Sequence, residues 1–166
     1  YTTTYTTLTV ADGSYFSLNI NGAYEDSGLG VLVEDEVTQN DMLWIGWSGN
    51  TLGIYNGRIY DYGSILSAGI SGDMQNLQFA YRLVGRNHLI WLRGDGGDWH
   101  NGGDPTTLFN PSYVIERASD VPVGQLIIAG SIGQGDSDAR ITIHNAANTT
   151  GSVPEGFTAG KWNSRL

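Results

Sequence analysis

The fold class is indicated first by the stretch GIYNGRIY at residues 53–60, in which an Asn-Gly pair lies between two apolar runs. Asn and Gly both tolerate the positive φ angles of a type I′ turn, which joins two antiparallel strands through two residues. We therefore expect a β-hairpin with Asn56 and Gly57 at its tip. Two more hairpins are expected, one at residues 86–87 and a weaker one at residues 21–22.

Outward from this hairpin, apolar residues alternate with small polar residues in short segments that end at glycines. This pattern is typical of the strands of sandwiches and barrels, and it predicts about eleven short strands. They are expected at residues 3–10, 15–20, 30–33, 42–47, 52–55, 58–62, 77–84, 88–92, 113–117, 125–129 and 139–144. We expect a single all-β domain over residues 1–166, folded as a jelly-roll-like antiparallel sandwich of two sheets. The segment 145–166 shows no clear period and is expected to lie extended.

The composition agrees with an all-β chain. The 166 residues include 24 glycines and nine tyrosines, which are common in strands and tight turns and unfavourable in helices. The chain has no cysteine, which excludes disulfides and thiolate metal sites. No stretch approaches the ~20 apolar residues of a membrane helix, so we expect no membrane insertion. No basic-then-apolar leader follows Tyr1, as expected of a mature product or an excised domain.

The charge balance is strongly acidic. Seventeen acidic residues face eight basic ones, for a net charge of -9, and no Lys or Arg precedes Arg58. Such a surface repels phosphate backbones. Nucleic acid is therefore not an expected partner.

The longest stretch without strand periodicity is RGDGGDWHNGGDPTTLFN at residues 93–110. Loops of this length in compact domains usually carry function or move. Trp99 lies there among glycines, where no strand pattern would bury it, and rings of this kind stack on the C–H faces of sugars. The candidate ligand-binding residues of the loop are Asp98, Trp99, His100, Asn101 and Asp104. The alternative is a solvated glycine turn whose aspartates cap backbone amides.

Three aspartates of this loop, Asp95, Asp98 and Asp104, are also candidate ligands for Ca²⁺, although their spacing does not match an EF-hand. No other cofactor is expected. Trp47 and Tyr62 are further candidate stacking platforms for a sugar. The alternative for any single ring is burial in the core or pairing on the sheet surface.

No motif for catalysis is present. The histidines, His88, His100 and His144, lack the HExxH spacing, and no serine lies in a GxSxG elbow. We therefore expect no enzymatic activity. The sequence leaves open a pair of carboxylates for glycoside hydrolysis among its 17 acidic residues.

The loop at residues 97–104, together with a cysteine-free composition rich in Gly, Thr, Asn and Tyr, resembles the distal domains of phage tail fibres and tailspikes. Residues 99–104 are similar to the short Trp-His-x-Gly-Asn-like turn of such fibres, with an additional Asn and Gly. The resemblance implies a homotrimeric β-rich tip, outside the cell or on the virion surface, that binds a bacterial surface glycan or protein. It assigns no role to any single residue.

Aromatic and amide side chains on loops of a rigid β scaffold are typical of recognition surfaces. We therefore expect a non-catalytic domain that binds a carbohydrate or a cell-surface receptor, at the tip of an oligomeric appendage. Two other functions stay open from sequence. They are a structural fibre or capsid module with rings buried between subunits, and a small polysaccharide-degrading enzyme.

Overall fold

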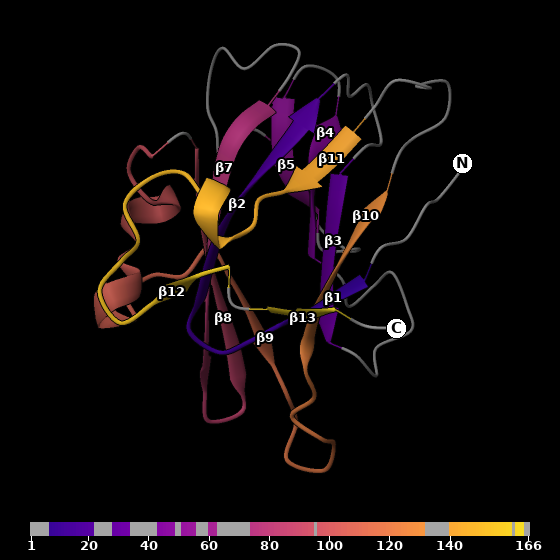
Figure 1. Cartoon of the computed structure of the whole chain (residues 1–166). Coiled ribbons are helices and arrows are strands. Elements are labelled where there is room, and N and C mark those ends of the chain that lie inside the picture. Colours follow the sequence, from indigo (N-terminus) through magenta and orange to yellow (C-terminus); the bar gives the residue numbers. More distant parts are fainter. Residues whose placement is uncertain are drawn as a thin grey trace.

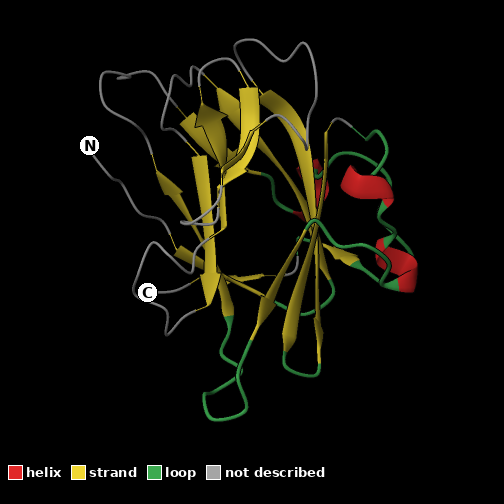
Figure 2. Ribbon diagram, turned by 180° about the vertical axis from the view of Figure 1, so that it is seen from behind, coloured by secondary structure: helices red, strands yellow, loops and turns green. Residues whose placement is uncertain are grey.

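A computed structural model describes residues 7–21, 28–33, 43–48, 51–55, 60–62, 74–94, 96–131, 140–160 and 162–164. Within this part of the chain two antiparallel sheets pack against each other (Figures 1 and 2). The expected all-β sandwich is therefore confirmed.

One sheet has seven strands in the order β13-β1-β10-β3-β4-β5-β6. Their bounds are β1 Thr7–Val10, β3 Gly28–Val33, β4 Leu43–Ser48, β5 Thr51–Tyr55, β6 Tyr60–Tyr62, β10 Leu126–Ser131 and β13 Trp162–Ser164. The other sheet has the order β11-β2-β7-β8-β9, with β12 paired in parallel to β2. Its bounds are β2 Ser14–Asn21, β7 Met74–Val84, β8 Asn87–Gly94, β9 Tyr113–Glu116, β11 Arg140–Ile143 and β12 Thr158–Ala159.

The three predicted hairpins have different outcomes. Strands β5 and β6 do pair, but Tyr55 lies opposite Tyr60, so four residues rather than two separate the paired positions. Strands β7 and β8 do form a hairpin, but Val84 pairs with Asn87, so its two-residue turn is Gly85 and Arg86, one residue earlier than expected, with Gly85 at φ 59°. The hairpin after Asn21 is wrong, because β2 and β3 lie in different sheets.

Alternation along β2, β7 and β8 separates the two faces of the six-stranded sheet. Phe16 and Leu18, with every second residue of the neighbouring strands, face the seven-stranded sheet. Phe16 stacks on Phe79 with ring centroids 4.7 Å apart. The buried residues of this inter-sheet core are Val10, Phe16, Leu18, Val31, Val33, Leu77, Phe79, Tyr81, Ile90, Leu92, Ile115, Leu126 and Ile128.

The outer face of the same sheet is also covered. Tyr15, Ala80 and Trp91 are opposed in register and form a second buried cluster with Phe157. Residues 90–93 of β8 are consequently buried without interruption, as expected of a strand covered on both sides. A third layer therefore lies outside the six-stranded sheet.

This third layer consists of two chain segments, residues 96–110 and 144–160. The second contains the 3-10 turn η4 (Ala146–Asn148) and is fixed to β2 by the bond from the Gly160 amide to the Tyr15 carbonyl, 2.7 Å. It leads to β13 at the edge of the opposite sheet. The segment expected to lie extended thus links both sheets.

Candidate functional site

Loop 96–110 follows β8 and contains the 3-10 turns η2 (His100–Gly102) and η3 (Pro105–Thr107). It lies at the left of Figure 1, beside the yellow segment 144–160. Gly96 and Gly151 approach closely enough that a Cβ on Gly96 would lie 4.0 Å from the Gly151 Cα. The two segments therefore form one surface.

A row of three polar residues on the outer face, Ser17, Gln78 and Arg93, holds this surface to the sheet. Ser17 Oγ accepts the Thr150 amide at 3.0 Å. Gln78 Nε2 donates to Thr150 Oγ1 at 3.0 Å, and Gln78 Oε1 accepts the Gly96 amide at 2.6 Å. Both segments are thus bonded to one side chain, Gln78.

Arg93 completes the polar row as a buried cation. Its Nη2 donates to Tyr15 Oη and to the Ser152 carbonyl, both at 2.8 Å. Its Cζ lies 4.3 Å from the Trp99 ring centroid and 5.6 Å from that of Tyr15. Rings attract a guanidinium through their electron-rich faces. Burial raises the pKa of Tyr15, although the hydrogen bond and charge of Arg93 act against it.

Trp99 is half-buried, in contrast to the exposure expected from its glycine-rich surroundings. Its ring meets Tyr15 edge-on at 6.3 Å and packs against the second buried cluster. The sequence pattern missed this contact because the ring packs against side chains from two strands, Tyr15 of β2 and Arg93 of β8. Trp99 therefore fixes the loop on the sheet.

The turn at residues 103–110 is held by its own backbone. Asp104 and Phe109 exchange amide–carbonyl bonds of 2.8 and 2.9 Å. Trp91 Nε1 donates to the Phe109 carbonyl at 2.9 Å. Asp104 Oδ1 also accepts from the Thr106 amide and hydroxyl, which holds the pKa of its carboxyl below the usual value. A Cβ on Gly103 would collide with the Asn110 carbonyl, so this position requires glycine.

The same turn holds two apolar side chains in solvent. Phe109 is 56% exposed and Leu108 is 41% exposed. Leu108 has φ 60°, a left-handed conformation that costs a non-glycine residue about 1–2 kcal/mol. Sequence reasoning missed both residues, although an apolar pair in a polar loop before Pro111 was a usable signal.

Of the predicted site residues, Asp98 and Asn101 are exposed, while His100 and Asp104 are partly buried. They lie on the same loop as Phe109. Trp47 and Tyr62 lie elsewhere, on β4 and β6 of the seven-stranded sheet, which the six-stranded sheet separates from the loop. The structure describes only the backbone of these two residues.

Among the described residues no group of three His, Cys, Asp or Glu side chains is placed to hold a metal. Asp95 lies outside the described residues. One carboxylate oxygen of Asp104, Oδ1, already accepts hydrogen bonds from Thr106. The calcium site remains a prediction.

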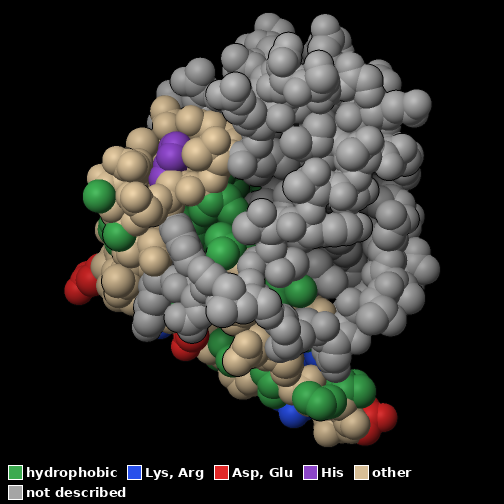
Figure 3. Space-filling model, turned by 45° about the vertical axis from the view of Figure 1, so that its right-hand side comes forward, with side chains coloured by type: hydrophobic (Ala, Val, Ile, Leu, Met, Phe, Trp, Pro, Cys, Tyr) green, Lys and Arg blue, Asp and Glu red, His purple; other side chains and the backbone are tan. Residues whose placement is uncertain are grey.

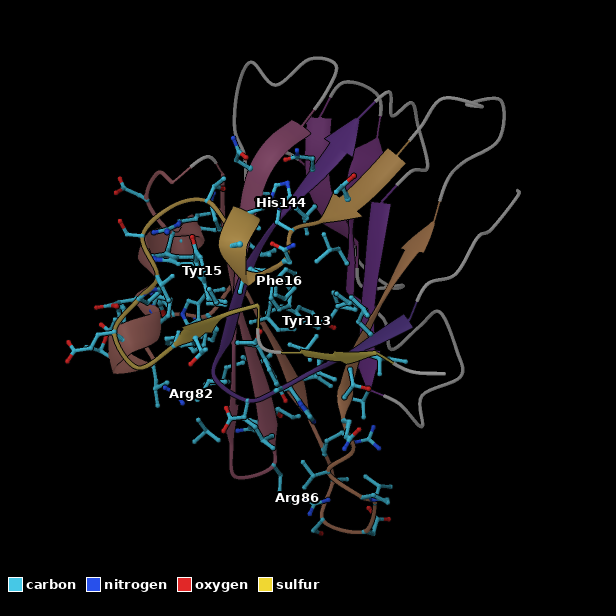
Figure 4. All side chains as sticks on the ribbon, viewed as in Figure 1. Tyr15, Phe16, Arg82, Arg86, Tyr113 and His144 are labelled. Atoms are coloured by element: carbon cyan, nitrogen blue, oxygen red, sulfur yellow. The ribbon has the colours of Figure 1, made fainter. Side chains whose placement is uncertain are left out.

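Ser17 and His144 are in hydrogen-bond contact, with Ser17 Oγ 2.5 Å from His144 Nδ1. His144 lies at the top of segment 144–160 in Figure 4. Ser17 is fully buried and its oxygen already accepts the Thr150 amide. This pair therefore fastens the segment and offers no nucleophile to solvent.

Comparisons with known proteins assign no family. No family model and no curated protein matches the chain. A solved structure described as a functionally unknown protein from Saccharomyces cerevisiae is similar at 14% identity and a TM-score of 0.34, over 86% of this chain and 72% of the other. Within the described residues no helix is long and apolar enough to cross a membrane.

Proposed function

We propose that this domain is a non-catalytic recognition module that binds carbohydrate through the turn at residues 103–110 and the adjoining loop. The observation that carries the proposal is the ring of Phe109, 56% exposed on a turn fixed by Trp91 and Asp104. A rigid exposed ring offers a sugar face a large contact at little cost in side-chain entropy.

Polar side chains suited to sugar hydroxyls lie on the same loop as this ring. Asp98, Asn101 and Asn110 are exposed on the same loop, and their amides and carboxylate can donate to or accept from hydroxyl groups. We name Asp98, Asn101, Leu108, Phe109 and Asn110 the recognition surface. The left-handed Leu108 supports this choice, because strain in a well-bonded turn is common at binding sites.

Trp99, His100 and Asp104 take a supporting role in this proposal. Trp99 covers Arg93, and Asp104 closes the turn on Phe109 and Thr106. They position the loop, whereas the exposed residues touch the ligand. Display on a trimeric appendage outside the cell or on a virion remains the setting that the phage-fibre resemblance implies.

The proposal is tested by a glycan array probed with the purified domain, first with Ca²⁺ and then with chelator. Specific binding in both conditions supports recognition without a metal, and loss with chelator would assign Ca²⁺ to the aspartates of the loop. Silence across the array contradicts carbohydrate binding and favours a protein receptor or a structural module.

A further inference from the structure

The arginine side chains in the described part of the chain hold the protein's own backbone. Each of the four that the structure describes donates to a main-chain carbonyl. The pairs are Arg82 with Gly156 (3.3 Å), Arg86 with Ala118 (2.6 Å), Arg93 with Ser152 (2.8 Å) and Arg117 with Pro122 (3.1 Å). Arg93 and Arg117 are also buried, each 8% exposed, and Arg82, labelled with Arg86 in Figure 4, lies over the Phe157 ring.

The acidic side chains show the opposite distribution. Of the six that the structure describes, five are exposed and one, Asp104, is partly buried. They are Asp12, Asp98, Asp104, Glu116, Asp120 and Glu155. In Figure 3 acidic side chains lie on the outside of the described surface, at its left edge and at its lower end. The described surface therefore presents carboxylates, while its guanidinium groups are bonded to carbonyls.

The third layer carries this imbalance to the recognition surface. Loop 96–110 and segment 144–160 contain three acidic residues, Asp98, Asp104 and Glu155, and no Lys or Arg. Beneath them, Arg93 is covered by the Trp99 ring, 4.3 Å from its centroid. Proteins bind carboxylate, sulfate and phosphate groups mainly through Arg and Lys. An acidic group of a ligand on this layer would therefore meet carboxylates and receive no Lys or Arg from either segment.

We propose that the recognition surface binds glycans built of uncharged sugars and rejects glycans that carry acidic groups. This inference rests on the proposed carbohydrate binding and names its ligand class. The exposed carboxylate of Asp98 can accept hydrogen bonds from the hydroxyls of a neutral sugar, whereas it repels a carboxylate or a sulfate at the same distance. The net charge of -9 adds a repulsion of longer range. Stacking of the sugar ring on Phe109 is the same for both kinds of glycan, so charge decides between them.

The experiment is a glycan array of three matched sets, probed at low ionic strength and pH 8, where imidazoles carry little charge. The sets are neutral hexose chains, the same chains oxidised at C6 to uronates, and the methyl esters of those uronates. Hexoses and esters should bind, and the uronates should bind about tenfold more weakly or less. Equal binding of uronate and ester overturns this inference but leaves carbohydrate binding intact. Silence on all three sets contradicts the proposed function and this inference with it.

The matched variants are Asp98→Asn and Asp120→Asn, which remove the same charge from two exposed positions. Asp120 lies on the connection between β9 and β10, residues 117–125, which we call the tip loop. The tip loop forms the lower end of the molecule, away from loop 96–110, in Figures 1 and 2. Asp98→Asn should raise the ratio of uronate to ester binding severalfold, and Asp120→Asn should leave it close to the wild-type ratio. Equal ratios in the two variants would overturn the role of the recognition surface in rejecting acidic glycans.

Discussion

At the scale of single residues, the contact between Arg93 and Trp99 explains how a glycine-rich loop keeps one conformation. Arg93 is 8% exposed, and its guanidinium lies against the Trp99 ring. Its Nε has no hydrogen-bond partner among the described residues, so ring contacts and two neutral oxygens compensate the buried charge. Removing the Trp99 ring would leave the buried Arg93 charge without its cation–π contact.

Trp99→Ala should therefore lower the free energy of unfolding by about 2–4 kcal/mol, through lost burial and lost cation–π contact. Urea denaturation followed by circular dichroism measures this. Trp99→Phe, which keeps a ring over Arg93, should lose clearly less. Unchanged stability in Trp99→Ala, combined with lost ligand binding, would instead make Trp99 a direct contact residue.

In contrast to Trp99→Ala, a substitution at Leu108 is expected to stabilise the domain. Asn tolerates the left-handed conformation better than Leu, and the Leu108 side chain is 41% exposed. Leu108→Asn should raise the free energy of unfolding by about 0.5–1 kcal/mol while it weakens ligand binding. Thermal melts and binding on the same preparation test both parts, and a destabilised variant would show that Leu108 packs rather than contacts a ligand.

At the scale of elements, the polar row on the outer face binds the third layer to the sheet. Gln78 is 1% exposed and bonds both covering segments. Gln78→Ala should cost about 1–3 kcal/mol, because it removes the hydrogen bonds that the buried Gln78 side chain makes to Gly96 and Thr150. Hydrogen exchange should speed up at Gly96 and Thr150 first. Thr142→Val, an exposed change on β11, is the control that should have no such effect.

The same elements show what the sequence could and could not predict. Alternation located strands β1 to β11, because burial on one face leaves a period of two, but it missed the short strands β12 and β13. It could not reveal the third layer, because Ser17, Gln78 and Arg93 follow the same alternation that a solvent-facing row would show. The candidate loop was found from its glycines. Phe109 was missed although Leu108 and Phe109 are an apolar pair in a polar loop; that its turn is fixed follows from the bonds to Asp104 and Trp91, which the sequence does not show.

At the scale of the whole molecule, buried ionisable groups set the pH range of stability. Burial, followed by the charge of Asp12, raises the pKa of Tyr81. A raised tyrosine pKa gives stability that is complete below the unfolded value of about 10 and is lost as the pH rises further. The lowered pKa of His88 gives stability that is complete above about 6.5 and is lost as the pH falls.

The melting temperature should consequently be highest between about pH 6.5 and pH 10. Above pH 10 the free energy of unfolding should fall by up to about 1.4 kcal/mol per pH unit. Calorimetry from pH 5 to pH 11 measures both limbs. Tyr81→Phe should reduce the loss of stability above pH 10, with the remainder coming from Tyr15, whose pKa burial also raises. A loss of unchanged slope would assign it to tyrosines other than Tyr81.

The central claim is recognition through Phe109, and the most direct measurement compares the wild type with Phe109→Ala on a glycan array. Val121→Ala, an exposed apolar change at the tip loop, is the matched control. Loss of a stacking ring should weaken binding about tenfold or more, with the melting temperature and the control's binding unchanged. Equal binding by wild type and Phe109→Ala would contradict the claim.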